Sequence, residues 1–531
     1  MYMKTNSKNR LATVKKVAVK KDEPKTTNST SSSKNLGFFI KRLREDRNLT
    51  QTDFAKLLKT SQSAVARIEN GGQNMTTDEL NRISVALGRK IVAISDSIDV
   101  EINGGRKLSG TIPTNTSKNG SLGLICASLL NKGKTRLHGI PRIEEVQRII
   151  ELMESIGVSI KWMDKNTLEI VVPKKLKIDD LDKIAAGRIR SGLMMIGPMI
   201  HLEKSFKMPH SGGCKMGQRT ISAHKYGLED LGVKINTKID HYLIESKKLK
   251  PAHIIMSESS DTAAENLIMA ASLIKGKTTI QFTTSNYMVQ EVCFFLETLG
   301  VKIDGIGTTT LVVHGIDEIN MDVDYYNSED PTESMMFISA AVVTGSELSV
   351  TRCPIDFLAL ELFQLKKMGL KYKQSPVYLA TNGRTKLVDI TVYPSKLIAS
   401  IDKIHARPYP GINTDNLPFF VPIAVLAKGT TMIHDWMWEN RAIYYTELNR
   451  LGANINLADP HRVFIQGPTE LKAAQIVCPL ALRPAMIIMV AMLAAKGRSI
   501  LRNIYPISRG YEDIAERLNG IGADIKVIKE I

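Results

Sequence analysis

The sequence predicts a mixed α/β (α+β) protein, in which an all-α module precedes two larger halves built from helices and strands. Three observations lead to this prediction. The chain has 531 residues, which is more than one hydrophobic core accommodates. A short segment near the N-terminus has helical periodicity, and the remainder repeats one supersecondary unit six times. Its apolar fraction of 43% and charged fraction of 24% are typical of a globular protein.

The repeat is marked by a helix end of the form apolar-Gly-apolar-x-apolar, as in SIGVSI and DLGVKI. Each copy places a glycine where a helix needs a left-handed C-cap, and a β-branched strand follows. The six glycines are Gly157, Gly232, Gly300, Gly369, Gly452 and Gly522. Each unit is therefore predicted to run helix, strand, helix, glycine turn, strand, with its apolar helices buried beneath sheets. Six units divide most simply into two halves of three, and the cleft between such halves is a usual ligand site.

The N-terminal module spans residues 36–95 and contains the segment LTQTDFAKLLKTSQSAVARIENG. Thr50 and Asp53 predict a capping box at the start of one helix, and the next helix is predicted to open at Ser61 and close at Asn70-Gly71. This segment resembles the Cro/repressor-type helix-turn-helix. The resemblance implies binding to double-stranded DNA through Gln51, Ser61, Gln62, Ser63 and Arg67. The alternative is a helical protein-protein module that has lost DNA binding.

Charge and cysteine content restrict the class of protein. The net charge is +17, and the basic, Ser/Thr/Asn-rich residues 1–35 are predicted to be a disordered tail, either solubilising or phosphate-seeking. Five cysteines without CxxC pairs argue against a disulfide framework and a zinc site. No apolar run long enough to span a bilayer and no signal-peptide core are found in the sequence. We therefore expect a cytoplasmic protein that binds no membrane.

Seven motifs occur in order along the repeated region: TSKNGSL, IRSGLMMIGPM, SGGCKMGQR, YPGINTDN, WENR, LRPA and ISRGYE. Together with the six units, they resemble the enolpyruvyl transferases, and more closely the UDP-N-acetylglucosamine 1-carboxyvinyltransferase branch. That family has two domains of three βαβαββ units each. The resemblance implies one domain at 117–327 and a second formed by 100–116 with 328–531. It also implies a role in the first committed step of peptidoglycan synthesis.

The implied substrates are phosphoenolpyruvate and UDP-N-acetylglucosamine, both anionic, and such ligands call for lysine and arginine. The residues that match the phosphoenolpyruvate site are Lys118, Asn119, Arg219, Arg441, Arg483 and Arg509. Those that match the nucleotide-sugar site are Arg190, Arg219, Ser260, Asp415, Met437 and Trp438. No metal or cofactor is expected, because protein cations supply the electrostatic stabilisation.

Four of these positions are implied to be catalytic: Cys214, Asp415, Lys118 and Arg441. Cys214 lies between glycines, with Lys215 next to it, and adjacent positive charge favours the thiolate. In the family this cysteine can attack phosphoenolpyruvate, takes part in proton transfer and is the target of fosfomycin. Asp415 matches the base that accepts the proton of the sugar 3-hydroxyl. Cys126 and Cys293, within apolar helices, are interpreted as buried small hydrophobes instead.

Five positions depart from the family pattern. Glu145 replaces an aspartate near an active-site arginine, and Ala481 and Ser508 replace the aspartates of DLRA and DRGYE. In the stretch SESSDTAAEN, Glu258 replaces a cation and Asp261 a valine, and both carboxylates would repel a diphosphate. Three hypotheses stay open: a transferase acting on UDP-N-acetylglucosamine, a paralogue that uses another acceptor, and a transcriptional regulator whose transferase-like part senses a cell-wall precursor. A homodimer is plausible, since repressors of this kind bind two-fold sites.

Overall fold

The structure is a computed structural model that describes residues 49–71, 98–210, 212 and 220–529, together with single residues between 37 and 86. The chain separates into two compact units, residues 1–96 and 97–531, and each is described by itself. The predicted tail at 1–35 lies outside the described residues. In the described part of the chain, no helix has the length and hydropathy needed to cross a membrane.

The first unit contains helices α2 (Gln51–Leu57) and α3 (Gln62–Glu69). The predicted capping box is confirmed, because the Thr50 hydroxyl accepts from the Asp53 amide while the Asp53 carboxylate accepts from the Thr50 amide. Ser61 caps α3 as predicted, and Gly71 after its end has φ of +68°. The two helices pack around a small core that includes Phe54, Val65 and Ile68.

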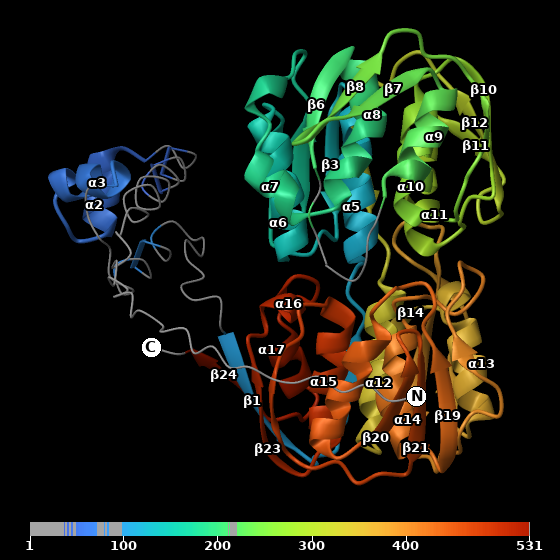
Figure 1. The fold of residues 1–531 in the computed structure, drawn as a ribbon. Helices are drawn as coiled ribbons and strands as arrows, with labels where there is room; N and C mark the ends of the chain where they lie inside the picture. The colour runs from blue at the N-terminus through green and yellow to red at the C-terminus, as the bar shows by residue number, and fades with distance from the viewer. Residues whose placement is uncertain are drawn as a thin grey trace, which may run out of the picture. The chain divides into compact units, whose positions relative to one another are not determined.

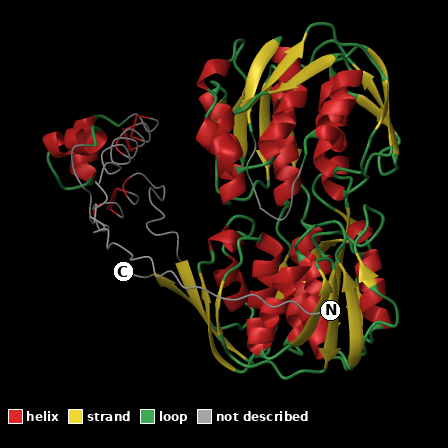
Figure 2. Ribbon diagram, viewed as in Figure 1, coloured by secondary structure: helices red, strands yellow, loops and turns green. Residues whose placement is uncertain are grey.

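The second unit has two lobes, each with its own hydrophobic core and three sheets (Figures 1 and 2). The elements of the first lobe are α5 (Lys118–Ala127), η1 (Ser128–Leu130), β3 (Lys134–His138), α6 (Glu144–Ser155), β4 (Ser159–Trp162), β5 (Leu168–Val171), η2 (Ile178–Asp180), α7 (Lys183–Arg188), η3 (Ser191–Met195), α8 (Ile196–Leu202), β6 (Ser205–Pro209), α9 (Ser222–Asp230), β7 (Val233–Thr237), β8 (His241–Ser246), β9 (His253–Ile255), α10 (Asp261–Ser272), β10 (Gly276–Gln281), α11 (Tyr287–Thr298), β11 (Lys302–Asp304), β12 (Thr310–Gly315) and β13 (Val323–Tyr326). Its sheets have the strand orders β13-β3-β5-β4, β6-β8-β7 and β11-β12-β10-β9.

The second lobe combines the first strands of this unit with its C-terminal half. Its elements are β1 (Ile98–Gly104), β2 (Thr111–Pro113), α12 (Pro331–Val343), β14 (Leu348–Pro354), η4 (Ile355–Phe357), α13 (Ala359–Lys367), β15 (Lys371–Gln374), β16 (Tyr378–Leu379), β17 (Lys386–Tyr393), β18 (Ile404–His405), η5 (Leu417–Phe419), α14 (Phe420–Leu426), β19 (Gly429–His434), η6 (Ala442–Leu451), β20 (Asn454–Asp459), β21 (Arg462–Gly467), β22 (Gln475–Val477), α15 (Leu482–Ala494), β23 (Gly497–Arg502), α16 (Tyr505–Ser508), α17 (Ile514–Asn519) and β24 (Ile525–Lys529). Its sheets have the orders β22-β23-β1-β24, β15-β17-β14-β2 and β18-β19-β21-β20.

The six predicted units are present. The sheet of the last unit includes a strand from the start of this part of the chain. β1 pairs antiparallel with both β23 and β24, so the N-terminal strand of this unit completes its last sheet (Figure 1). β2 pairs parallel with β14, and β13 pairs parallel with β3. We propose that the two cores define two domains, 117–327 and 100–116 with 328–531, connected by the segments that follow β2 and β13.

The helices of the units lie beneath the sheets, as their composition predicts. α12 and α15 are buried around almost their whole circumference, and they pack against each other in the second core. Two units deviate from regular helices. The second helix of the fifth unit is the 3₁₀ helix η6, and that of the sixth is divided into α16 and α17. Gly300 and Gly452, at the predicted helix ends, both have φ of +90°, which confirms the left-handed cap at these positions.

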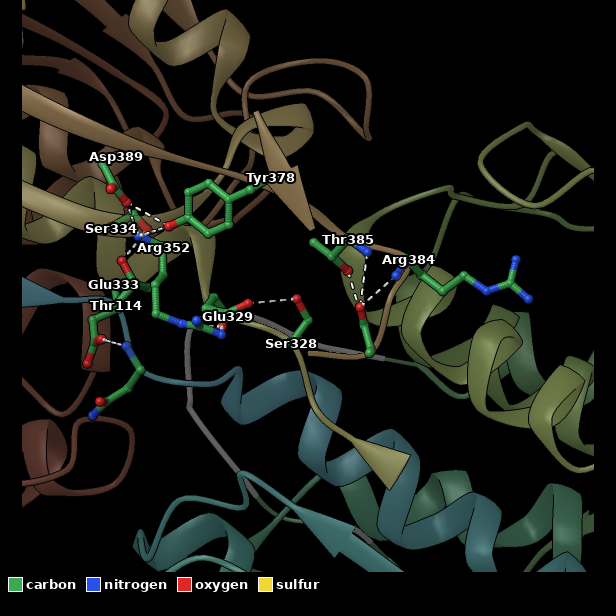
Figure 3. Close-up of polar contacts among 12 residues, drawn as sticks. Thr114, Ser328, Glu329, Glu333, Ser334, Arg352, Tyr378, Arg384, Thr385 and Asp389 are labelled. Carbon is green, nitrogen blue, oxygen red and sulfur yellow. Dashed lines mark hydrogen bonds and ion pairs between the residues drawn. The ribbon is translucent and has the colours of Figure 1, made fainter. Parts of the chain in front are cut away.

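Two segments cross between the lobes, residues 114–117 and residues 327–330. A network of ion pairs and hydrogen bonds fixes them (Figure 3). On one crossing segment, Glu329 is 3% exposed and accepts from Arg352 Nε at 2.8 Å. Arg352 has φ of +60° in a β-bulge of β14, and its backbone amide donates to the Tyr378 hydroxyl and to Asp389. Glu333 similarly pairs with Arg517 and accepts from the Asn115 amide on the other crossing segment. Buried carboxylates thus hold both crossings against the second lobe.

The left-handed glycines give a direct test of the fold. Replacing Gly300 by alanine should lower the free energy of unfolding by about 1 kcal/mol, because its φ is positive while a Cβ there would meet nothing within 4 Å. Gly187→Ala is the matched control, since Gly187 also has open space but lies inside α7 with no positive φ. The Gly187→Ala change should raise the free energy of unfolding by about 0.5–1 kcal/mol. Thermal unfolding of both variants measures the difference, and equal shifts would contradict the predicted cap geometry.

Candidate active site

The Arg441 side chain of the second lobe is a fully buried charged group, 0% exposed like its partner Asp435. Its Nε donates to Asp435 Oδ2 at 2.5 Å and its Nη2 to Asp435 Oδ1 at 2.8 Å. The Tyr445 hydroxyl donates to the same carboxylate, and Nη2 also reaches the carbonyl of Thr414 at 2.7 Å. Nη1 has no hydrogen-bond partner in the described part of the chain. Its one charged neighbour is Asp415, at 4.0 Å, so this donor is available to an anion.

Arg483 is the second buried guanidinium, near the start of α15. Its Nη1 donates to the Tyr511 hydroxyl at 2.8 Å and its Nη2 to Asp415 Oδ2 at 3.0 Å. Its Nε is buried without a partner among the described residues. Burial raises the pKa of Asp415, but Arg483, Arg441 and Lys118 outweigh burial and hold that pKa below its usual value. Asp415 is therefore ionised at neutral pH and lies among three cations.

Lys118 and Arg509 approach from different lobes and share one carboxylate. Glu145 of α6 pairs with Lys118 Nζ at 2.6 Å and with Arg509 Nη2 at 2.8 Å. Burial raises the pKa of Glu145, and the two cations more than offset this, so the pKa is lowered overall. Glu145, although it departs from the family pattern, thus contacts an arginine of the site. Its two ion pairs link the first lobe to the second.

Three residues of the site are missed by sequence analysis: Tyr287 and Asp330 lie outside the seven motifs, and Tyr511 lies in ISRGYE without an assigned role. The Asn119 amide donates to the Tyr287 hydroxyl at 3.0 Å. Burial raises the pKa of Tyr287 well above its usual value, and the charges of Asp330 and Asp415 add to this effect. Asp330, which caps α12, and Tyr511 both act on Arg483. Asp435 is a fourth such residue. Acidic residues and tyrosines are common in all folds, so only their convergence distinguishes these four.

The described residues assigned to the nucleotide sugar are divided between the lobes: Arg190 and Ser260 lie on the first, and Asp415, Met437 and Trp438 on the second. Ser260 caps α10 with its hydroxyl, and Asp261 accepts from the Asn286 amide at 3.1 Å. Burial raises the pKa of Asp261, and the Asp415 charge acts in the same direction. Arg190 Nη2 donates to the carbonyl of Thr220 at 2.9 Å.

Glu258 interacts electrostatically with this same arginine. Burial lowers the pKa of Arg190, whereas the charges of Tyr242 and Glu258 raise it. The unexpected carboxylate therefore lies near a cation of its own chain, which partly offsets the repulsion expected from the sequence. On the second lobe, Trp438 donates its indole N–H to Thr414 Oγ1 at 2.9 Å, and Met437 packs against the second core.

Cys214 and Arg219 lie outside the described residues. Cys126 and Cys293 are buried, as their positions in apolar helices predict. Burial raises the pKa of both thiols, so they stay protonated.

In the first unit, the exposed face of α3 carries the residues expected to contact DNA. Ser61, Gln62, Ser63 and Arg67 are exposed, while Val65 and Ile68 face the core. Gln62 Nε2 donates to Gln51 Oε1 at 2.7 Å, and Gln51 in turn donates to the buried carboxylate of Glu69. The exposed face of α3 thus carries small polar groups at the start of the helix and one cation, Arg67, in its last turn.

Residues 102–518 match the family model described as EPSP synthase (3-phosphoshikimate 1-carboxyvinyltransferase). The chain is 32% identical over 431 residues to UDP-N-acetylglucosamine 1-carboxyvinyltransferase from Bradyrhizobium diazoefficiens, which covers 81% of this chain and 98% of that protein. The protein of the same name from Treponema denticola is 33% identical over 427 residues, covering 80% and 98%. The chain belongs to the enolpyruvyl transferase family.

Solved structures of enolpyruvyl transferases have the same fold as residues 97–531. The enolpyruvyl transferase NikO from Streptomyces tendae superimposes with a TM-score of 0.68 at 23% identity, covering 82% of this chain and 100% of that one. EPSP synthase from Acinetobacter baumannii superimposes with a TM-score of 0.64 at 17% identity, covering 81% of this chain and 100% of that one. The predicted fold class is confirmed. Residues 40–94 match a helix-turn-helix family model, which confirms the all-α module in front of the transferase.

Beside the site of this transferase, a buried carboxylate connects the lobes. Glu291 of α11 is 3% exposed and accepts from the Ser328 amide at 3.1 Å and from the Asn382 side chain of the second lobe at 3.3 Å. Burial, together with the nearby charge of Glu329, raises the pKa of Glu291 to about 7, although the hydrogen bonds from Asn382 and Ser328 oppose this. Glu291 in the folded protein therefore keeps its proton over a range of pH in which the same carboxyl group of the unfolded chain is ionised.

This shift predicts a pH-dependent stability. Since the unfolded pKa of glutamate is about 4.3, the stability contributed by protonated Glu291 is present at low pH and lost as pH rises through about 7. Relative to Glu291→Gln, the native protein should lose up to about 3 kcal/mol between pH 4.5 and 8. Thermal unfolding across this range measures the difference. Glu347→Gln, at an exposed position, is the control and should keep the native profile; parallel profiles for Glu291→Gln and the native protein would refute the prediction.

Proposed function

We propose that this enolpyruvyl transferase transfers the enolpyruvyl group of phosphoenolpyruvate to the 3-hydroxyl of UDP-N-acetylglucosamine with release of phosphate. One observation carries the proposal: four cations from two lobes, Lys118, Arg441, Arg483 and Arg509, surround the carboxylates of Asp415 and Glu145. Two of their buried nitrogens, Arg441 Nη1 and Arg483 Nε, have no hydrogen-bond partner in the described chain. Phosphoenolpyruvate carries a phosphate and a carboxylate, which are the groups such donors bind.

Each cation has a distinct part in the proposed reaction. Arg441 is held rigidly by Asp435 and offers a preorganised donor to an oxyanion. Lys118 and Arg509 pair with Glu145 in the free protein and become available when the ligand's charge competes with that carboxylate. Arg483 also binds Asp415. An anion bound to Arg483 therefore weakens the ion pair between Arg483 and the Asp415 carboxylate. The pKa of Asp415 then rises, and the group becomes a stronger base after the first substrate has bound.

The proposed chemistry proceeds through a tetrahedral intermediate. Asp415 accepts the proton of the sugar 3-hydroxyl as its oxygen bonds to carbon 2 of phosphoenolpyruvate, and a proton is added at carbon 3. Cys214, matched to the family's cysteine, is the proposed donor of that proton. Loss of a proton from carbon 3 and departure of phosphate from carbon 2 then restore the double bond. Asn119 contributes to the proposed phosphoenolpyruvate site, together with Arg219.

The nucleotide sugar is proposed to bind across both lobes, through Arg190, Ser260, Met437 and Trp438. Ala481 and Asp261 favour the alternative that the chain senses a cell-wall precursor or uses another acceptor. Ala481 precedes α15 without a side-chain cap, and Asp261 places a partly buried carboxylate near Asp415. A second carboxylate at this location suits an acceptor that offers hydrogen-bond donors.

Phosphate release tests the reaction. Purified protein given phosphoenolpyruvate and UDP-N-acetylglucosamine should release phosphate, and Asp415→Asn should lower the rate by a factor of about 10² or more, since it removes the base but keeps the shape. Asp402→Asn, at an exposed aspartate of the same lobe, should leave the rate unchanged. Release that persists in Asp415→Asn would refute the assigned base. Binding of UDP-N-acetylglucosamine without any release would favour the sensor, and no binding would favour another acceptor.

We also propose that the N-terminal module binds double-stranded DNA through Gln51, Ser61, Gln62, Ser63 and Arg67. The exposed polar face of α3 and the basic charge of the chain support this. Binding to a DNA duplex should weaken steeply as salt increases, and Arg67→Ala should reduce the slope of log K against log salt by about 1. Lys526→Ala, on β24, is the charge-matched control. Affinity that does not change with salt would contradict the proposal.

A further inference from the structure

A second concentration of positive charge lies on the second lobe, over the sheet β18-β19-β21-β20. An open hollow of about 470 Å³ is present there. The residues that line it are Lys403, His405, Arg407, Pro408, His434 and Trp436. None of the four cations assigned to the transfer reaction is among them. Figure 1 shows β19 and β21 side by side in this lobe.

The alternation of side chains along two paired strands creates the hollow. Ile404 and Ala406 are buried in the second core, which leaves Lys403, His405 and Arg407 on the opposite face. On the neighbouring strand Ile433 and Asp435 are buried, so His434 and Trp436 face the same way as the cations. The register then aligns His405 with His434, and His434 with Arg462. A row of basic side chains therefore crosses three adjacent strands.

The positive charges that line the hollow are not balanced within the lining, whereas Arg462 at the end of the row is paired with Asp459. Among the six described lining residues none is acidic, and Asp459 is engaged with Arg462 at 2.6 Å. Burial lowers the pKa of His434, and the charges of Lys403 and Arg462 lower it further, with Asp459 opposing. Burial and the charges of Arg407 and Lys403 likewise lower the pKa of His405, although its hydrogen bond to the Lys403 backbone opposes this. Mutual repulsion of this kind is relieved when an anion binds.

Two side chains of the hollow are already held in place. Trp436 donates its indole N–H to the Ala406 carbonyl at 2.7 Å, yet the residue is 47% exposed, so part of the ring is open to solvent. Arg407 donates its Nε to His405 Nε2 at 2.7 Å, which orients the guanidinium. A fixed aromatic ring beside a fixed cation is a suitable arrangement for a ligand that has both a flat ring and a negative charge.

We propose that this hollow binds a free mononucleotide, with its phosphate on Lys403 and Arg407 and its base stacked on Trp436. The size of the hollow lies within the range of small-molecule sites, and its lining extends over only six residues, which suits one nucleotide unit rather than a duplex. The hollow is separate from the proposed catalytic cleft. Asp435, between His434 and Trp436 in the sequence, is buried on the other face and binds Arg441.

Calorimetric titration of the full chain with thymidine 5′-monophosphate at low salt tests the proposal. Arg407→Gln should weaken binding by about tenfold, because it removes a charge-assisted hydrogen bond to phosphate. Lys366→Gln removes an equal charge from an exposed position on α13 and should leave binding unchanged. Trp436→Leu should weaken binding of the nucleotide but not of inorganic phosphate, since only the nucleotide stacks. The melting temperature of each variant is measured alongside to confirm that it is folded.

Three results would overturn the proposal. The first is no binding of thymidine 5′-monophosphate at millimolar concentration. The second is binding that Arg483→Gln abolishes and Arg407→Gln does not affect, which would locate the nucleotide in the catalytic cleft. The third is that a single-stranded oligonucleotide of ten thymidine nucleotides binds through Arg407 with an affinity more than tenfold higher than that of the mononucleotide. That result would identify the hollow as a contact for nucleic acid instead of a free nucleotide.

Discussion

The buried ion pair between Arg441 and Asp435 is the interaction on which the site depends. A guanidinium with no solvent exposure is stable only if its charge is compensated and its nitrogens are bonded, and Asp435 provides a two-pronged partner. The same arginine holds the Thr414 carbonyl and thereby the loop that carries Asp415. One nitrogen is left unbonded, so the pair both supports the loop and presents a donor to a ligand.

Carboxylates link the two lobes, and Phe357 of the second lobe adds an apolar contact by packing in the core of the first. Glu145 binds Lys118 of the first lobe and Arg509 of the second, while Glu329 and Glu333 fix the crossing segments to Arg352 and Arg517. Contacts of this kind are sensitive to competing charge. An anion entering between Lys118 and Arg509 would exchange one set of ion pairs for another without disturbing either hydrophobic core. Ligand binding and the relative placement of the lobes are therefore expected to be coupled.

The departures from the family pattern have different physical consequences. Glu145 keeps the charge of the residue it replaces and retains an arginine contact. Glu258 lies near Arg190 and acts on its pKa, so its charge is partly compensated within the chain. Ala481 and Asp261 are not compensated in this way. The first lacks a capping group, and the second adds a partly buried carboxylate close to Asp415. Both of these departures lie at positions that we propose to be on the acceptor side of the site.

The sequence by itself determined the architecture. The six helix-glycine-strand junctions, the apolar helices and the capping box at Thr50 are local features, so residues close together in the chain suffice to predict them. Motifs likewise predicted Lys118, Asp415, Arg441 and Arg483 as site residues, and the charges of these four residues act on one another in the structure. Only the tertiary structure decided which groups meet. Asp435, Tyr287 and Asp330 become part of the site through contacts between distant elements, and β1 completes a sheet with β23 and β24 from the far end of the chain. Burial and ion pairing set the protonation of these groups, and both depend on packing that no local pattern of residues encodes.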